Sequence, residues 1–238
     1  DVDHYLAMQT REIGVNAIER EDTALVNLVT RFFNTYMRAS INATSVRTAY
    51  NVLHQYREFG EKVIESGDEE RVDEIVNYLK YYGLLSFNRK LSFLLETAAY
   101  DICALMQRIR EVDLPNEQEM LRLFLTVDRE YEGEEKPYEE SLRGVRKAQV
   151  KLATFYLAEE REDLARLVHE DMANESRVRL SSIKEEMTSV TEKYFWEIID
   201  RGVNLDYLPP EQHRHLETFF GWFEDLPPSP RQSRFVGS

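Results

Sequence analysis

The sequence predicts an all-α protein, built as an antiparallel helical bundle or a short α-solenoid of about ten helices. Apolar residues recur every three or four positions along most of the chain, which is the period of an amphipathic helix. The 238 residues include only 9 glycines and 7 prolines. So few turn-forming residues suit long helices joined by short loops better than many strands.

Helical periodicity begins over residues 3–20. Asp22 is expected to cap a second helix, whose apolar stripe consists of Leu25, Leu28, Val29, Phe32, Phe33 and Tyr36. A polar loop over residues 40–44 then precedes a third helix. The face of that helix carries Val46, Ala49, Tyr50, Leu53, Tyr56 and Val63.

The third helix is expected to stop near Gly67, where Ser66 and Glu69 have the spacing of a capping box for the next helix. The face of this fourth helix carries Val72, Ile75, Val76 and Leu79.

Segment 87–110 is richly apolar and is expected at the centre of the first core. It contains Cys103, the only cysteine, which we interpret as a buried thiol acting as a small hydrophobe. Pro115 fits the first turn of a further helix.

An acidic segment divides the predicted fold. Residues 129–137 include Gly133 and Pro137 and have no apolar period, so they are expected to link a helical subdomain at 1–128 to a helical hairpin subdomain at 138–226. The tail, residues 227–238, is expected to be flexible. Helices beyond the linker are predicted at about 138–159, 162–173, 176–201 and 209–224.

A partial repeat pattern lies in the second predicted subdomain. Leu152, Ala153, Tyr156 and Ala165 have the spacing of four positions of the tetratricopeptide pattern. No second copy is visible at a period of about 34 residues, so the pattern is better explained by a generic helical hairpin.

Composition excludes several classes of partner. The net charge of −14 argues against a general nucleic-acid surface and against broad adhesion to anionic lipid. The single cysteine and the lack of a signal peptide favour a reducing compartment, and hence the cytoplasm. Within the cytoplasm, a position at the inner face of the membrane is one option. No apolar run approaches the roughly 20 residues that span a bilayer. Because the chain begins at Asp1, we expect it to be part of a longer protein, whose remaining part would carry either a membrane anchor or a catalytic domain.

No catalytic or metal-binding motif is recognisable, and no cofactor is predicted. No histidine follows a glutamate by three residues, and no H-E-x-x-H, Walker A, G-x-G-x-x-G or G-x-S-x-G pattern occurs. His54 and Glu58 share a helical face and are interpreted as a surface pair. A non-enzymatic role is favoured, although a catalytic cluster assembled from distant helices stays open.

One loop has the composition of an anion site. Short polar side chains lie between two arginines, directly ahead of a helix whose first N–H groups favour a phosphate or carboxylate. The alternative is that Asn42 or Thr44 simply caps this helix. The candidate anion-binding residues are Arg38, Ser40, Asn42, Thr44, Ser45 and Arg47.

A family resemblance covers the same region. Segment 28–53, with Ser40-Ile41-Asn42 followed by Thr48-Ala49 and Leu53, resembles the S-P-x-I-N-D-P-x-T-A neighbourhood of an uncharacterised family of bacterial multi-spanning membrane proteins. Ala43-Thr44 replaces the Asp-Pro of that family. The resemblance implies a soluble domain that follows a membrane anchor, and it implies no particular activity.

Two functions are predicted from different classes. The first is a non-enzymatic interaction or regulatory domain that binds a protein partner or forms a homo-oligomer. Its partner surface would include Phe195, Trp196, Phe219 and Trp222, within a cluster completed by Tyr194, Phe220 and Phe223; core packing is the alternative for these aromatics. The second is a small-molecule sensor that binds an anion through the Arg38–Arg47 loop, in a pocket between helices.

Overall fold

The computed structural model confirms the all-α class. It describes residues 2–115, 117–125, 139–173, 183–184, 187 and 210–224, and every regular element in these ranges is helical. The chain divides into two compact units, unit 1 (Asp1–Ala148) and unit 2 (Gln149–Ser238). None of the helices described is both long enough and apolar enough to span a lipid bilayer.

The helices of unit 1 follow one another with short turns between them. They are α1 (Val2–Glu19), α2 (Thr23–Asn42), α3 (Val46–Ser66), α4 (Glu69–Asn88), α5 (Ser92–Glu111) and α6 (Glu117–Leu125). α7 (Glu139–Ala158) crosses from unit 1 into unit 2. The described part of unit 2 continues with α8 (Glu162–Ala173), the 3-10 turn η2 (Pro210–Gln212) and α11 (His213–Glu224).

The predicted helices beyond the acidic segment agree closely with α7, α8 and the η2–α11 pair. The hairpin residues Leu152, Ala153, Tyr156 and Ala165 are all fully buried. The predicted linker at 129–137, most of the helix predicted at 176–201, and the tail at 227–238 lie outside the described residues.

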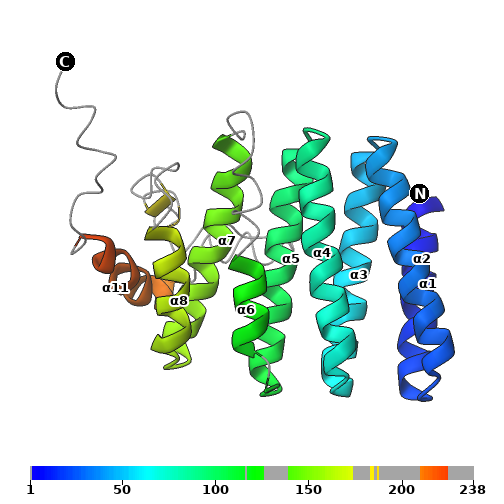
Figure 1. The fold of residues 1–238 in the computed structure, drawn as a ribbon, viewed down its shortest axis with the longest axis horizontal. Coiled ribbons are helices and arrows are strands. Elements are labelled where there is room, and N and C mark those ends of the chain that lie inside the picture. Colours follow the sequence, from blue (N-terminus) through cyan, green and yellow to red (C-terminus); the bar gives the residue numbers. More distant parts are fainter. Residues whose placement is uncertain are drawn as a thin grey trace. The chain divides into compact units, whose positions relative to one another are not determined.

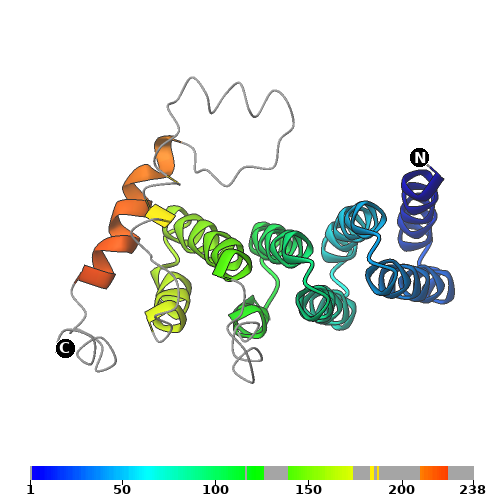
Figure 2. The same ribbon diagram turned by 90° about the horizontal axis from the view of Figure 1, so that it is seen from above.

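The helices α1–α6 form two layers. α1, α3 and α5 pack side by side in one layer, and α2, α4 and α6 pack side by side in the other (Figures 1 and 2). The extensive contacts in this unit join each helix to the next one and to the next but one. Such one-dimensional stacking is the architecture of an α-solenoid, so of the two predicted forms unit 1 takes the second.

The turns of unit 1 recur at a constant interval. One residue in each turn has a positive φ, and each of these residues lies 23 positions after the previous one: Glu21, Thr44, Gly67, Lys90 and Asp113. Two helices and their turns therefore make a repeat of 46 residues. This length is that of HEAT and armadillo repeats and differs from the 34 residues expected of a tetratricopeptide repeat.

The helix caps follow the same repeat. The predicted cap Asp22 is confirmed, since its carboxylate accepts from Leu25 N at 3.0 Å. Asp68, 46 residues later, accepts from Arg71 N at 3.2 Å at the start of α4. The predicted capping box of Ser66 and Glu69 is wrong, because Ser66 is still the last residue of α3 and its Oγ donates to a carbonyl of that helix.

Glycines let the helices of one layer approach closely. The ring of Phe59 in α3 lies so near Gly14 of α1 that a Cβ at that position would come within 2.7 Å of it. One repeat later, Leu105 of α5 lies against Gly60 of α3, where the corresponding distance is 3.3 Å. A bulky residue on each helix therefore fills the space left by a glycine on the helix before it.

The division between the units falls inside α7 because the start of this helix packs on α5. Cys103 of α5 is buried, as predicted, and its thiol donates to Ala148 O at 3.1 Å. Gly144 also lies against the side chain of Glu96 in α5. The predicted position of α5 in the first core is confirmed by its buried face, which consists of Leu94, Leu95, Ala98, Ile102, Leu105, Met106 and Ile109.

Candidate functional site

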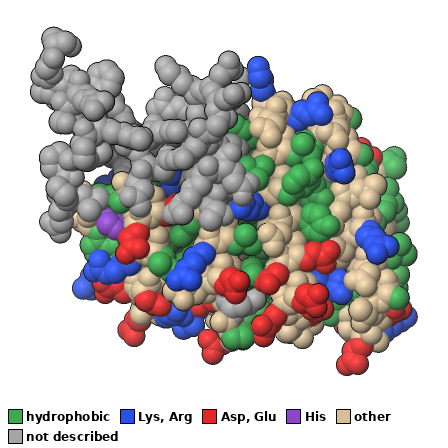
Figure 3. All heavy atoms as spheres, in the orientation of Figure 1, with side chains coloured by type: hydrophobic (Ala, Val, Ile, Leu, Met, Phe, Trp, Pro, Cys, Tyr) green, Lys and Arg blue, Asp and Glu red, His purple; other side chains and the backbone are tan. Residues whose placement is uncertain are grey.

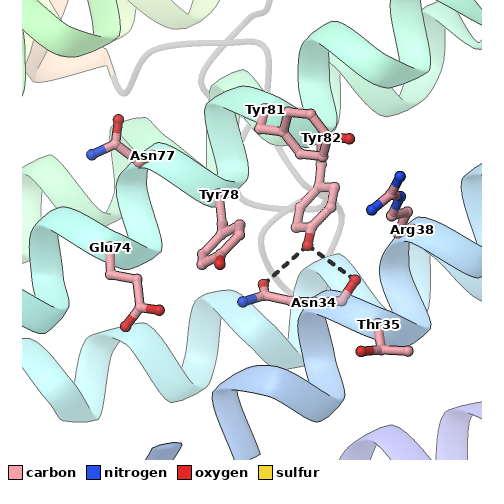
Figure 4. A pocket seen from close by; sticks show the side chains of 8 residues that line it. All are labelled: Asn34, Thr35, Arg38, Glu74, Asn77, Tyr78, Tyr81 and Tyr82. Atoms are coloured by element: carbon pink, nitrogen blue, oxygen red, sulfur yellow. Dashed lines mark hydrogen bonds between the residues drawn. The ribbon is translucent and has the colours of Figure 1, made fainter.

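A groove lies between α2 and α4 in the described part of unit 1. It has a volume of about 590 Å³ and is shown in Figure 4. Side chains three, four or seven positions apart share one face of a helix, so each helix supplies a row of groups to the groove. The lining residues are Asn34, Thr35 and Arg38 from α2, and Glu74, Asn77, Tyr78, Tyr81 and Tyr82 from α4.

Three tyrosines form a fixed wall in this groove. Tyr82 is buried, and its hydroxyl donates to the backbone and side-chain oxygens of Asn34, each at 3.0 Å. Burial raises the pKa of this hydroxyl, so it stays a donor. The ring of Tyr78 stacks on Tyr82 with centroids 6.0 Å apart, and Tyr81 packs edge-on at 5.4 Å while remaining 42% exposed.

Replacing Tyr82 with phenylalanine should lower the free energy of unfolding by about 1 kcal/mol, because two oxygens of Asn34 lose their shared donor while the ring contacts remain. Urea unfolding followed by circular dichroism measures this loss. The exposed neighbour provides the control, since Tyr81→Phe should leave stability unchanged. Equal stabilities for the two variants would contradict the role assigned to the Tyr82 hydroxyl.

The two ends of the groove carry opposite charges. Arg38 lies at one end and Glu74 at the other, with the tyrosines between them (Figure 4). Arg38 is exposed and has no ion-pair or hydrogen-bond partner among the residues described. Glu74 lies 3.9 Å from Arg71, whose guanidinium is already held by Asp68 at 3.1 Å. The positive charge of Arg38 and the negative charge of Glu74 are therefore both available to pair with a ligand.

A second hollow extends the first towards α6. It has a volume of about 260 Å³, shares Asn77 with the larger groove, and is also lined by Asp73, Glu119, Met120, Arg122 and Leu123. Burial raises the pKa of Asp73, with Glu119 adding to this effect. On the face of unit 1 drawn in Figure 3, acidic side chains gather over the lower half, below exposed apolar surface. The groove therefore becomes more acidic away from Arg38.

The structure does not bring the predicted anion-binding residues together. Ser40 is buried in the last turn of α2 and donates to Tyr36 O at 2.8 Å, and Asn42 ends the same helix and accepts from Arg89 at 3.0 Å. Thr44 has a φ of 54° in the turn. The N-cap of α3 is Ser45, so neither Asn42 nor Thr44 caps this helix.

A carboxylate of the chain itself lies at this helix start. Ser45 Oγ donates to Thr48 Oγ1 at 2.9 Å, and Thr48 donates to Asp3 Oδ2 at 2.8 Å. The Tyr36 hydroxyl donates to Asp3 Oδ1 at 2.5 Å, and these two hydroxyls hold the pKa of Asp3 below its usual value. The carboxylate of Asp3 in α1 therefore lies beside the first turn of α3, where it is held by two hydroxyl groups.

The two arginines of the predicted anion loop have different surroundings. Arg38 lines the α2–α4 groove, whereas Arg47 is exposed on the first turn of α3 and does not line it. The anion-binding prediction therefore stays a prediction, and of its two arginines Arg38 lines the α2–α4 groove.

The predicted aromatic partner surface is described in part. Phe219 is fully buried, as the core-packing alternative expects. Trp222 is half-buried, with the guanidinium of Arg166 4.4 Å from the centre of its ring. Phe195 and Trp196 lie outside the described residues. Partner binding here stays a prediction, and Phe219 has no exposed surface to contribute to it.

A cluster of ion pairs joins α1, α3 and α5 in the other layer. His54 Nε2 lies 3.0 Å from Glu58 Oε1, which confirms the predicted pair, and Glu58 also pairs with Arg11. Arg57 Nε lies 3.3 Å from Asp101 Oδ1. Burial raises the pKa of Asp101 to about 7, although Arg57 lowers it in part. Within the described ranges no three His, Cys, Asp or Glu side chains gather to hold a metal ion.

Sequence reasoning missed the groove for an identifiable reason. The buried face of α4 was predicted from its aliphatic residues alone. The spacing of Tyr78, Tyr81 and Tyr82 is that of core residues, so it does not mark them as the wall of a groove. The available signal was the local density of tyrosine: the sequence Asn77-Tyr78-Leu79-Lys80-Tyr81-Tyr82 holds three of them in six residues.

Comparison with known proteins gives one similar structure. No protein-family model matches the chain, and no curated protein matches it significantly. The chain is similar to a solved circular tandem repeat protein with novel repeat topology and enhanced subunit contact surfaces, with a TM-score of 0.43 and 17% identity over 93% of this chain and 58% of that one. This chain therefore spans less than two thirds of that protein's length. Nothing about function follows from similarity at this level, and the helical repeat is established by the turns and contacts of unit 1 itself.

Proposed function

We propose that this chain is an interaction domain that holds an extended segment of a partner protein in the α2–α4 groove. The observation that carries this proposal is the wall of Tyr78, Tyr81 and Tyr82 between the unpaired cation of Arg38 and the carboxylate of Glu74. The proposal places the partner surface in this groove, whereas the sequence predicted it in the aromatic cluster that includes Phe219 and Trp222.

The lining of the groove suits a polypeptide. Tyrosine rings present large, rigid apolar surface and lose little conformational entropy on binding, which is why they are enriched in protein interfaces. Asn34 Oδ1 accepts from Tyr82 and Asn77 Nδ2 donates to Asp73 O, so the amide nitrogen of Asn34 and the amide oxygen of Asn77 are the groups that can pair with a peptide backbone. Because the hollow continues past Asn77 to α6, it accommodates a segment longer than a compact metabolite.

The charges of the groove define the segment. An acidic side chain of the partner would pair with Arg38, an apolar or aromatic one would lie on Tyr81, and a lysine or arginine would approach Glu74 and Glu119. The net charge of −14 adds long-range attraction for a partner that is basic overall. In a membrane-associated protein of the kind that segment 28–53 resembles, such a domain would recruit a cytoplasmic partner.

A displayed library of random dodecapeptides tests this proposal. Peptides selected on the wild-type chain should carry the charge order described above, and their affinity, measured by fluorescence anisotropy, should fall at least about tenfold in Tyr81→Ser and in Arg38→Glu, because each removes a central contact. Arg20→Glu makes the same charge change at an exposed position in the α1–α2 turn and should leave affinity unchanged. Selected peptides that bind all three variants equally would refute the groove.

An anion sensor is the second candidate function, and Arg38 favours it. Its unpaired guanidinium lines a hollow of about 590 Å³, a volume within the usual range for small-molecule sites. A thermal-shift screen of anionic metabolites should then find one that raises the melting temperature of the wild type. The same compound should have no effect on Arg38→Gln, and a screen without any stabilising compound would exclude this function.

A further inference from the structure

Acidic residues are absent from two long segments of unit 1. Aspartate and glutamate make up 44 of the 238 residues, yet neither occurs in residues 23–57 or in residues 75–95. The first segment runs from α2 into α3, and the second runs from α4 into α5. Because successive helices are antiparallel, the α2–α3 turn and the α4–α5 turn lie at the same edge of unit 1, at the top of Figure 1.

The opposite edge of unit 1 is acidic. The α1–α2, α3–α4 and α5–α6 turns lie there, and they contain Asp22, Asp68 and Asp113. Cations at this edge are paired, since Arg71 lies 3.1 Å from Asp68 and Arg110 lies 3.3 Å from Asp113. On the face of unit 1 drawn in Figure 3, basic side chains lie at the upper edge and acidic ones gather over the lower half.

Three cations at the upper edge form a continuous group, which we call the basic edge: Arg38, Arg89 and Lys90. Arg89 Nη2 donates to Asn42 Oδ1 at 3.0 Å, which places this arginine beside the end of α2. Arg38 lies four residues before Asn42, on the same side of that helix. All three cations are exposed, and none of them pairs with a carboxylate among the residues described.

A structural role explains the basic edge only in part. Basic side chains near the end of a helix interact favourably with its dipole, and Arg89 is the C-cap of α4. This role does not account for Lys90, which lies beyond the cap, or for the absence of acidic residues from both segments. The carboxylate that α1 brings to this edge, Asp3, is bonded to the hydroxyls of Tyr36 and Thr48 and not to the basic edge.

The basic edge continues the α2–α4 groove, because Arg38 belongs to both. A segment that leaves the groove past Arg38 meets the end of α2, where Arg89 and Lys90 lie. We propose that the bound segment continues beyond the groove as a run of aspartate or glutamate residues that pairs with these two cations. The proposal rests on the peptide-binding function of the groove. It also fixes the direction of the segment, since Glu74 and Glu119 would repel an acidic run at the other end.

The size of the basic edge favours a short acidic segment over an extended polyanion. Proteins that bind nucleic acid neutralise about 6–10 phosphates, whereas the basic edge has three cations. A duplex or an anionic bilayer is also repelled by the net charge of −14. A short segment meets only the local field, because charges more than about 8 Å away are screened at physiological ionic strength. The acidic edge lies farther away, since a helix of 20 residues is about 30 Å long.

Extended peptides test this proposal. A peptide selected on the groove is synthesised with four glutamates, or with four glutamines, added at each end in turn. One of the two glutamate-extended peptides should bind the wild-type chain about fivefold more tightly than its glutamine counterpart at low ionic strength, because it gains exposed ion pairs. The gain should disappear in about 1 M salt, where the Debye length is about 3 Å. Fluorescence anisotropy measures these affinities.

A double variant assigns the gain to the basic edge. Arg89→Gln, Lys90→Gln should lose the gain and keep its affinity for the unextended peptide, whereas Arg20→Gln, Lys62→Gln, which removes the same charge near the acidic edge, should keep the gain. A gain that persists in the first variant, or equal binding of glutamate-extended and glutamine-extended peptides, would overturn the proposal. The groove function survives that result if binding of the unextended peptide still depends on Tyr81. If no peptide is selected on the wild-type chain, the groove function fails and this proposal fails with it.

Vesicles of phosphatidylserine test the competing partner. The wild-type chain should not sediment with these vesicles at physiological ionic strength, because its net charge has the same sign as theirs. Vesicle binding that is lost in the variant Arg89→Gln, Lys90→Gln would identify the basic edge as a membrane surface and would overturn its assignment to an acidic segment.

Discussion

Replacing Arg57 with leucine is expected to destabilise unit 1 by about 1–2 kcal/mol at pH 8, because the buried carboxylate of Asp101 loses its countercharge and must take up a proton instead. Asp101 is 4% exposed, and Arg57 Nε lies 3.3 Å from its Oδ1. Urea unfolding followed by circular dichroism gives the change in free energy. Lys62→Leu, which breaks the exposed ion pair of Lys62 with Glu65 on the same helix, should cost less than about 1 kcal/mol.

The cost of Arg57→Leu should depend on pH. Burial raises the pKa of Asp101 from 3.8 to about 7, so the folded state holds this proton more tightly than the unfolded chain does. The contribution of this group to stability is therefore largest below pH 4, is lost progressively as the pH rises from about 4 to about 7, and is constant above that. At pH 5 Asp101 is protonated and needs no countercharge, so Arg57→Leu should be much milder than at pH 8.

Asp101→Asn completes this test. An amide resembles the protonated acid, so this variant should be more stable than the wild type at pH 8 by about 2–4 kcal/mol, as a raised pKa of this size requires, and should lose the advantage at pH 4. A cost of Arg57→Leu that is the same at pH 5 and pH 8, or an Asp101→Asn variant less stable than the wild type at pH 8, would show that Asp101 is charged and well paired in the fold.

Gly14→Leu should cost about 3 kcal/mol, because overpacking a close helix contact forces side chains and backbone to shift. The first added carbon alone would lie 2.7 Å from the Phe59 ring and 2.8 Å from Val29 Cγ1. Even Gly14→Ala should destabilise the fold, although alanine is favoured over glycine within a helix by about 1 kcal/mol. Chemical denaturation measures both changes.

Gly221→Ala is the matched control for this prediction. Gly221 also lies within a helix, but no atom is within 4 Å of its added Cβ. Here only the preference of the helix for alanine acts, so stability should rise by up to about 1 kcal/mol. If Gly14→Ala stabilised the chain as Gly221→Ala does, the close packing of Phe59 on α1 would be disproved.

Local features of the fold could be predicted from the sequence. Helical period, the cap at Asp22 and the burial of Cys103 each depend on short-range preferences or on hydrophobicity, which residues carry wherever they lie. The end of α3 near Gly67 is confirmed, but the cap of α4 was misplaced by two residues, because the left-handed Gly67 follows Ser66 and Asp68 is the residue that caps the next helix. Polar residues that compete to cap a helix differ too little in capping free energy for the capping residue to be predicted from the sequence alone.

The 46-residue repeat could not be predicted, because its equivalent positions share size and burial rather than identity. Phe59 and Leu105 fill the same kind of space with different side chains, and each needs only the glycine opposite it. A core accepts many apolar residues of similar volume. The 46-residue period is therefore not visible as repeated residue types, although it is visible in the left-handed turn residues Thr44 and Lys90.

The candidate sites depended on which helices become neighbours. The start of α3 was predicted to bind an anion, a prediction that stays untested, and only the fold brings Asp3, 45 residues before Thr48, to this helix turn. The Tyr81 ring and the Ile13 side chain have the same spacing as core residues, and both are exposed because no described helix covers them. The sequence by itself determined that amphipathic helices form and must bury one face; tertiary structure decided which faces stay open, since burial is a property of pairs of helices and not of either one alone.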